Sequence, residues 1–252
     1  CIEPEVLFFS KNQRYFAKKV KMLLPPFSVI NKVTNKYKLY LECKKLGIDT
    51  PPTKEISFPL KKKINSLKFP LIVKPTFGWG MKNVKVIKNS KDFKQKTSNL
   101  RGKFIIQKYL GDFKKNIYAV GLLMDKDNKE KLNFVSKSLL TKFETGGPAI
   151  VGVEVKNQFL INTARKLINS LRFFEGPAMI EFIKYGNSKK FSLIDFNARI
   201  WGYSSLATFN GKNFPESIIN LLKNKNIKID KKQSKKFMLL RDFIDLKIPI
   251  SK

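Results

Sequence analysis

The sequence of 252 residues predicts a packed α+β protein. Hydrophobic residues make up 42% of the chain and include 22 Phe, which is enough to bury one or two ordinary cores. Amphipathic helical patterns are interspersed with short apolar strands, and one pair of strands is predicted to form an antiparallel hairpin. A chain of this length and composition is large enough to be an enzyme.

Composition argues against several kinds of protein and site. No apolar run approaches the roughly 20 residues that span a bilayer. The first residues lack the pattern of a secretory signal, so we expect a cytoplasmic protein without a membrane partner. Only two cysteines and no histidine are present. A disulfide framework, a thiolate zinc site and histidine-dependent catalysis are therefore not expected.

The chain is strongly basic, with 51 Lys and Arg against 19 Asp and Glu and a formal net charge of +32. A nucleic-acid-binding protein without catalysis is therefore one alternative. The excess is mainly lysine, is spread through the chain, and accompanies abundant Asn and Ile, as the codon bias of an AT-rich genome would produce. The aromatic-rich motif of the common RNA-binding module is also missing. We therefore do not expect nucleic acid as a partner.

Each element is predicted in turn along the chain. Residues 1–34 are interpreted as a connection from an upstream domain, because the sequence begins with Cys rather than Met. Apolar positions from 35 to 46 indicate an amphipathic helix that Gly47 ends. Strands are then predicted over residues 70–74, 83–87, 104–107, 117–124 and 132–137.

The second half of the chain continues the alternation of helices and strands. Residues 158–173 are predicted to form a helix with one apolar stripe. Strands over residues 178–183 and 191–197 flank a turn composition at 185–188 and are predicted to pair as a hairpin. A last helix is expected around residues 215–222.

The strand that ends at Arg199 carries the most informative pattern. Alternation places Asp195, Asn197 and Arg199 on one face and Ile194, Phe196 and Ala198 on the other. A carboxylate, an amide oxygen and a guanidinium suit a magnesium nucleotide, because magnesium takes hard oxygen ligands and arginine grips phosphate anions. An exposed strand face with three solvated residues is the alternative. The hairpin would add Glu181 as a second carboxylate.

Lys74 ends an apolar strand and precedes a turn that contains Gly78 and Gly80. Its ammonium could face phosphate while backbone N–H groups of the turn cover other oxygens. A strand-end lysine that reaches into water is the alternative. The turn is neither a P-loop nor a Rossmann turn, since Asn83 stands where the Rossmann pattern has its third glycine. Strand, turn and strand instead predict a flap that closes over a triphosphate.

Five short motifs follow one another at suitable spacing. They are Asn35-Lys36 at the helix start, Phe69-Pro70-Leu71-Ile72-Val73-Lys74-Pro75, Gln107-Lys108-Tyr109-Leu110-Gly111, Gly176-Pro177-Ala178-Met179-Ile180-Glu181-Phe182 and Ile194-Asp195-Phe196-Asn197-Ala198-Arg199. As an ordered set over roughly residues 30–220, they resemble the ATP-grasp superfamily. The nearest branch resembles the carbamoyl-phosphate synthase large chain and predicted carboxylate–amine ligases.

The resemblance implies the ATP-grasp fold, in which two α+β subdomains clamp ATP between antiparallel sheets. On this basis residues 35–106 are expected to form the N-terminal subdomain with the phosphate flap. Residues 107–252 are expected to form the C-terminal subdomain with the metal site.

The resemblance also implies roles for individual residues. For the nucleotide, Lys36 and Lys74 correspond to lysines that bind it, Gly78 and Gly80 to the flap, and Asp112 to a ribose contact. The linker that reads adenine corresponds to Gln107, Lys108, Tyr109 and Leu110. Ligands of magnesium or manganese correspond to Glu181, Asp195 and Asn197, and Arg199 corresponds to the catalytic arginine that stabilises an acyl phosphate.

The implied activity is an ATP-dependent ligase that activates a small-molecule carboxylate as an acyl phosphate and joins it to an amine or a related nucleophile, forming a carbon–nitrogen bond. A variant would use bicarbonate as the carboxylate. A degenerate ATP-binding module without catalysis is an alternative, because the flap has few glycines. Trp201, Gly202 and the turn Thr145-Gly146-Gly147 are candidates for the acceptor pocket, with core and turn roles as the alternative.

Overall fold

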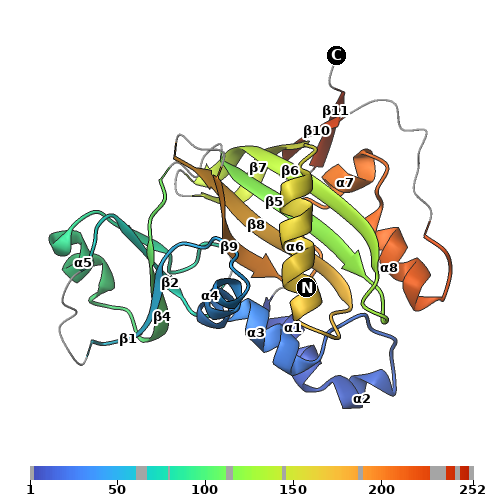
Figure 1. Cartoon of the computed structure of the whole chain (residues 1–252), viewed down its shortest axis with the longest axis horizontal. Coiled ribbons are helices and arrows are strands. Elements are labelled where there is room, and N and C mark those ends of the chain that lie inside the picture. Colours follow the sequence, from blue (N-terminus) through green and yellow to red (C-terminus); the bar gives the residue numbers. More distant parts are fainter. Residues whose placement is uncertain are drawn as a thin grey trace.

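The computed structural model describes residues 3–60, 67–78, 80–111, 116–143, 146–186, 190–227, 237–241 and 245–249. In these ranges the chain forms two antiparallel sheets with helices packed around them (Figure 1). The helices are α1 (Glu3–Lys11), α2 (Gln13–Ala17), α3 (Phe27–Thr34), α4 (Lys36–Lys45), α5 (Ser90–Thr97), α6 (Gln158–Ser170), α7 (Ser205–Phe209) and α8 (Phe214–Leu222). The strands are β1 (Thr53–Phe58), β2 (Leu71–Pro75), β3 (Lys85–Ile87), β4 (Gly102–Lys108), β5 (Ile117–Met124), β6 (Glu130–Phe143), β7 (Gly146–Glu154), β8 (Gly176–Tyr185), β9 (Lys190–Asn197), β10 (Phe237–Arg241) and β11 (Asp245–Pro249).

The small sheet has the strand order β1-β4-β2-β3. Its core contains Phe58, Leu71, Ile87 and Phe104, and it also includes Phe93 of α5. β2 and β3 pair as an antiparallel hairpin, with Val73 opposite Lys85. The predicted strand, turn and strand are therefore confirmed, and the described residues between the two strands, 76–78 and 80–84, are called the flap.

The large sheet has the strand order β11-β10-β7-β6-β5-β8-β9. Helix α6 lies across one face of this sheet (Figure 1), and it shares a buried core there with residues of α1, α3 and α4. Its Leu160, Ala164, Leu167 and Ile168 are fully buried, as an amphipathic stripe requires. Helices α7 and α8 contribute Leu206 and other apolar residues to the core on the opposite face. Both faces of the sheet are therefore covered.

The hairpin of β8 and β9 forms as the sequence predicts, and Glu181 stands directly opposite Asp195. The strict alternation predicted for β9 is wrong at one residue. Phe182 pairs with Leu193, so Ile194 is the extra residue of a β-bulge. The bulge places Ile194 in the same cavity lining as Asp195 rather than on the opposite face.

Helix α4 joins the two sheets at the point where the site forms. Asn35 caps its N-terminus and accepts hydrogen bonds from the backbone N–H groups of Tyr37 and Lys38. The backbone N–H of Lys36 donates to the carbonyl of Thr76 in the flap, at 2.9 Å. The start of α4 is thereby attached to the flap, and this fixes where the Lys36 side chain begins.

The segment interpreted as a connection contains three helices, α1, α2 and α3, and residues 21–26 between α2 and α3 have no regular secondary structure. Val6 of α1 and Val29, Ile30 and Val33 of α3 are buried in the core of the large sheet. This segment therefore packs as part of the same body. None of the helices in the described ranges is both long and apolar enough to cross a membrane.

Candidate functional site

A cavity of about 400 Å³ lies between the small sheet, the flap and the large sheet. It brings together most of the residues that the sequence singled out. The predicted residues in its lining are Lys36, Lys74, Gly78, Gly80, Gln107, Glu181, Asp195, Asn197 and Arg199. These positions are up to 163 residues apart in the chain (199 − 36), so the fold itself assembles the site.

Lys36 and Asp195 form an ion pair across the cavity. The distance from Lys36 Nζ to Asp195 Oδ1 is 2.6 Å, and the exposed fractions of the two side chains are 9% and 25%. Burial raises the pKa of Asp195, but the positive charges of Lys36 and then Lys74 outweigh it, so the net shift is downward. The carboxylate is therefore held in its ionised form, which is the form that binds cations.

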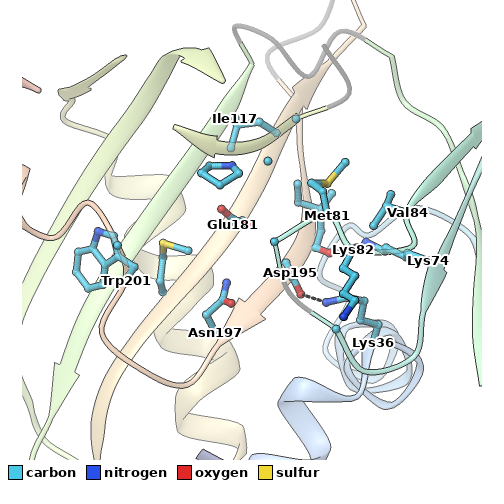
Figure 2. Close-up of a pocket in the computed structure, with 18 of the residues that line it drawn as sticks. Lys36, Lys74, Met81, Lys82, Val84, Ile117, Glu181, Asp195, Asn197 and Trp201 are labelled. Atoms are coloured by element: carbon cyan, nitrogen blue, oxygen red, sulfur yellow. Dashed lines mark hydrogen bonds and ion pairs between the residues drawn. The ribbon is translucent and has the colours of Figure 1, made fainter. Parts of the chain in front are cut away.

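Lys74 approaches the same strand from the small sheet. Its ammonium donates to the carbonyl of Ile194 at 3.2 Å, and the residue is 9% exposed. Burial, and secondly the charge of Lys36, lower the pKa of Lys74 to about 8, while Asp195 and Glu181 oppose the change. Figure 2 shows Lys36 and Lys74 on the side of the cavity opposite Glu181 and Asn197. A polyanion between them would stabilise this poorly solvated cation.

Glu181 lies beside Asp195 on the neighbouring strand. Burial, followed by the negative charge of Asp195, raises the pKa of Glu181 to about 7, although Lys36, Arg199 and Lys74 act in the opposite direction. Two carboxyl groups and the amide oxygen of Asn197 thus share one wall. Within the described ranges, no group of three or more His, Cys, Asp or Glu is arranged to hold a metal ion. The donor set suits a magnesium ion that takes its other ligands from phosphate and water.

Arg199 lies next to these oxygen donors. Its Nη2 donates to Asn197 Oδ1 at 3.1 Å, and its Nη1 donates to the carbonyl of Ile200 at 3.2 Å. A third partner is Glu3 of α1, whose carboxylate is 2.9 Å from Nη2. The guanidinium is therefore fixed at the cavity wall, where it can contact an anion.

The flap reaches across the cavity to the large sheet. Gly80, Met81 and Asn83 all have left-handed backbone angles, with φ of 62°, 65° and 59°. Asn tolerates this conformation well, so the tight turn forms without the additional glycines of a more glycine-rich flap. A Cβ on Gly147, the second residue of β7, would lie 3.1 Å from Met81 Cγ. The flap tip therefore contacts the opposite wall.

The residues predicted to read adenine are only partly in the cavity. Gln107 lines it, and its side-chain amide donates to Thr53 Oγ1 at 2.8 Å. Lys108, Tyr109 and Leu110 are not in the lining. The backbone N–H groups of Lys108 and Tyr109 donate to the carbonyls of two prolines, Pro52 and Pro70. Their role in adenine recognition stays a prediction. Asp112, the predicted ribose contact, lies outside the described residues.

The acceptor-pocket candidates line the cavity where they are described. Gly146, Gly147, Trp201 and Gly202 are in the lining, whereas Thr145 lies outside the described residues. Trp201 is also a core residue, since it is 3% exposed and packs edge-on against Phe214. The core role of Trp201 is confirmed, and the same ring lines the cavity, while its role in an acceptor pocket stays a prediction.

Gly121 of β5 makes room for this tryptophan, and replacing it tests the cavity wall. A Cβ at position 121 would lie 2.2 Å from Trp201 Cη2, so the ring would have to move. We expect Gly121→Ala to lower the free energy of unfolding by about 1–3 kcal/mol through overpacking. Gly152→Ala in β7 is the control, because a Cβ there meets Leu206 at an ordinary 3.4 Å. Equal midpoints for both variants in urea unfolding would contradict this packing.

Sequence reasoning missed several residues of the lining. Lys82 and Val84 come from the flap, Ile117 from β5 and Arg241 from β10. The guanidinium of Arg241 lies against Gly202, since a Cβ there would be 2.7 Å from Arg241 Nη1. Lys82 could have been suspected from its position between the flap glycines and β3. No signal pointed to Arg241, because β10 follows a long basic stretch and was not predicted.

Comparison with known proteins gives consistent results. The family model described as the ATP-grasp domain matches residues 33–203. No curated protein matches the chain. Among solved structures, the L-amino acid ligase of Bacillus licheniformis is 18% identical with a TM-score of 0.73, and the match covers 95% of this chain and 60% of the ligase.

Two further structures match over a similar extent. The N5-carboxyaminoimidazole synthetase of Staphylococcus aureus, complexed with ADP, is 16% identical with a TM-score of 0.73, and the match covers 92% of this chain and 62% of that protein. The biotin carboxylase of Campylobacter jejuni, in a β,γ-ATP complex, is 17% identical with a TM-score of 0.72, over 93% and 57% of the two chains. This chain therefore spans about 60% of the length of these proteins.

The matches to the solved structures extend over both sheets. The residues matched by the family model include Lys36 and Lys74 and the oxygen-donor wall, which consists of Glu181, Asp195 and Asn197. The chain belongs to the ATP-grasp domain family.

Proposed function

We propose that this chain binds ATP with magnesium and acts in an ATP-dependent carboxylate–amine ligase. The observation that carries the proposal is the meeting of Lys36 and Lys74 with Asp195 in one cavity, where Lys36 Nζ is 2.6 Å from the carboxylate and Lys74 Nζ is 3.2 Å from the adjacent backbone carbonyl. Cations on one wall and oxygen donors on the other are what a magnesium polyphosphate requires.

The residues of the large sheet fit the metal. Glu181, Asp195 and Asn197 supply three oxygen-bearing side chains to the same cavity. A bound magnesium ion, or manganese in its place, would neutralise phosphate charge and relieve the repulsion between the two carboxylates. In this proposal residues 35–106 supply the flap and both lysines, and residues 107–252 supply the metal ligands.

The remaining part of the cavity lining contains two arginines that can bind anionic groups. Arg199 and Arg241 both line the cavity, and Arg241 reaches it from β10 beside Gly202. Guanidinium groups bind carboxylates and phosphates through their N–H donors and their permanent positive charge. We assign the substrate carboxylate and the transferred phosphate to this part of the cavity, where Trp201 forms an apolar wall.

The proposed reaction has two displacements. ATP supplies the γ-phosphoryl group, which a substrate carboxylate oxygen attacks while ADP leaves, and the product is an acyl phosphate. The nitrogen of the amine then attacks the acyl carbon, and inorganic phosphate leaves. Lys74 and Arg199 contribute positive charge where negative charge collects on the phosphoryl oxygens. The flap, whose tip touches the opposite wall, excludes water that would hydrolyse the acyl phosphate.

ADP release with a panel of carboxylates and amines tests this function. We expect ADP to form only with magnesium and a carboxylate, and a carbon–nitrogen product to appear when an amine is added. Nucleotide binding without ADP release from any pair would instead support an ATP-binding module that lacks catalysis. The nucleic-acid alternative would show tight binding to DNA or RNA that weakens steeply as salt increases.

A further inference from the structure

The first helix contributes a charged residue to the arginine of the site. Glu3 begins α1, is 7% exposed, and directs its carboxylate at Arg199, which is 196 residues away in the chain. One oxygen, Oε1, accepts from Arg199 Nε at 3.2 Å and from Nη2 at 2.9 Å. The exposed fractions of the two side chains are 17% for Arg199 and 9% for Glu3. This ion pair is therefore largely removed from water.

The hydrogen bonds of Arg199 leave it little freedom. Besides the two bonds to Glu3, Nη2 donates to Asn197 Oδ1 and Nη1 donates to the carbonyl of Ile200. A guanidinium has five N–H groups in a fixed plane, and these bonds use four of them. The bonds to Glu3 involve the edge formed by Nε and Nη2, so rotation about the last side-chain torsions would break both. Glu3 thus sets the plane in which the remaining Nη1 donor lies.

Helix α1 is a firm support for this contact. Val6, one turn after Glu3, is buried in the core of the large sheet, and α1 packs against α3. The second oxygen of Glu3, Oε2, is buried and has no hydrogen-bond partner among the described residues. A carboxylate held in this way is costly unless a cation compensates it. Arg199 is the cation that does so, which ties the position of α1 to the site.

We propose that Glu3 is a positioning residue for Arg199, and that it holds the guanidinium plane in the orientation that meets the transferred phosphate. This proposal rests on the proposed function, because it assumes that Arg199 stabilises the acyl phosphate. Glu3 acts only through Arg199 and is not in the cavity lining. Its removal therefore affects the phosphoryl chemistry more than the binding of nucleotide.

The test compares Glu3→Gln with Glu5→Gln in the full chain. Both residues lie in the first turn of α1, so both variants lose the same favourable interaction with the helix dipole, but Glu5 is exposed. We expect Glu3→Gln to lower kcat about 10- to 100-fold, as a small misplacement of a catalytic group does, with an unchanged Kd for Mg-ATP. Glu3→Asp should restore part of kcat because it restores the charge. Glu5→Gln should leave kcat unchanged.

A double-mutant cycle separates positioning from a general loss of structure. In the Arg199→Ala background, Glu3→Gln should have no further effect on kcat, because the group that it positions is gone. An equal fold-loss in both backgrounds would overturn the proposal. So would a Glu3→Gln variant with the kcat of the unsubstituted chain.

Arginine side-chain NMR keeps the test independent of turnover. The arginines are Arg14, Arg101, Arg165, Arg172, Arg199 and Arg241, so the Nε–H signals are few, and the signal lost in Arg199→Ala is that of Arg199. We expect slow hydrogen exchange of this signal, which becomes faster in Glu3→Gln and stays slow in Glu5→Gln. If the chain had no ligase activity but the exchange were slow, the proposed function would be refuted, whereas the contact of Glu3 with Arg199 would still be supported. Fast exchange in the unsubstituted chain would refute the positioning role alone.

Discussion

Lys74→Met is expected to reduce turnover about 10²- to 10³-fold, the range observed when one preorganised donor is removed from a transition state. Lys74 is a buried cation of the cavity wall, and its pKa is lowered to about 8, first by burial and then by Lys36. Methionine has a similar length without the charge. Steady-state ADP release measures the effect. Lys85→Met is the control, because Lys85 is exposed on the neighbouring strand.

The same substitution is expected to stabilise the protein when no nucleotide is present. Because the folded-state pKa of about 8 is below the ordinary value of 10.5, the unfolded chain binds more protons between these pH values. Stability should therefore rise with pH from about 8 to 10.5, and the full penalty, on the order of 3 kcal/mol, applies below pH 8. Urea unfolding should show this rise in the unsubstituted chain and its loss in Lys74→Met. A less stable Lys74→Met at neutral pH would contradict the assignment of Lys74 as a desolvated cation.

Asp195→Asn is expected to reduce magnesium-dependent turnover by about 10³-fold. Loss of a carboxylate ligand of the metal should remove several kcal/mol of transition-state stabilisation, and each 1.36 kcal/mol changes the rate tenfold. Asparagine keeps the shape and one oxygen, but it removes the charge that Lys36 contacts at 2.6 Å. Titration of ADP release with magnesium should show a much higher half-saturating concentration of the metal.

The control for this variant is Asp127→Asn, which makes the same chemical change at an exposed turn. Its magnesium titration should match that of the unsubstituted chain. If Asp195→Asn had the same magnesium dependence as Asp127→Asn, Asp195 would not be a metal ligand and the oxygen-donor wall would need another role.

Local patterns in the sequence predicted much of the large sheet. The bounds predicted for β5 agree with those observed, and so does the hairpin of β8 and β9, which places Glu181 on the strand beside Asp195 and Asn197. β5 and β8 are nearly continuous apolar runs, and a turn composition separates β8 from β9, so these strands are recognisable from local sequence. The bulge at Ile194 could not be predicted, because it is a property of the paired strands rather than of either strand alone.

The elements that were missed lack such patterns. β1 has a mixed sequence, TKEISF, with only its two ends fully buried, and β10 follows a long basic stretch. The roles of Glu3 and Arg241 at the site could not be inferred, because each depends on a long-range contact. Glu3 meets Arg199 across 196 positions, and Arg241 reaches Gly202 only after β10 joins the sheet beside β7.

A crystal structure with magnesium and a non-hydrolysable ATP analogue would show whether the triphosphate lies between the two sheets. We expect Lys74 Nζ within about 3.2 Å of a phosphate oxygen. We also expect a magnesium ion about 2.1 Å from an Asp195 oxygen and from an oxygen of the same triphosphate. A nucleotide bound outside this cavity, or a triphosphate that contacts only one of the two sheets, would contradict this expectation.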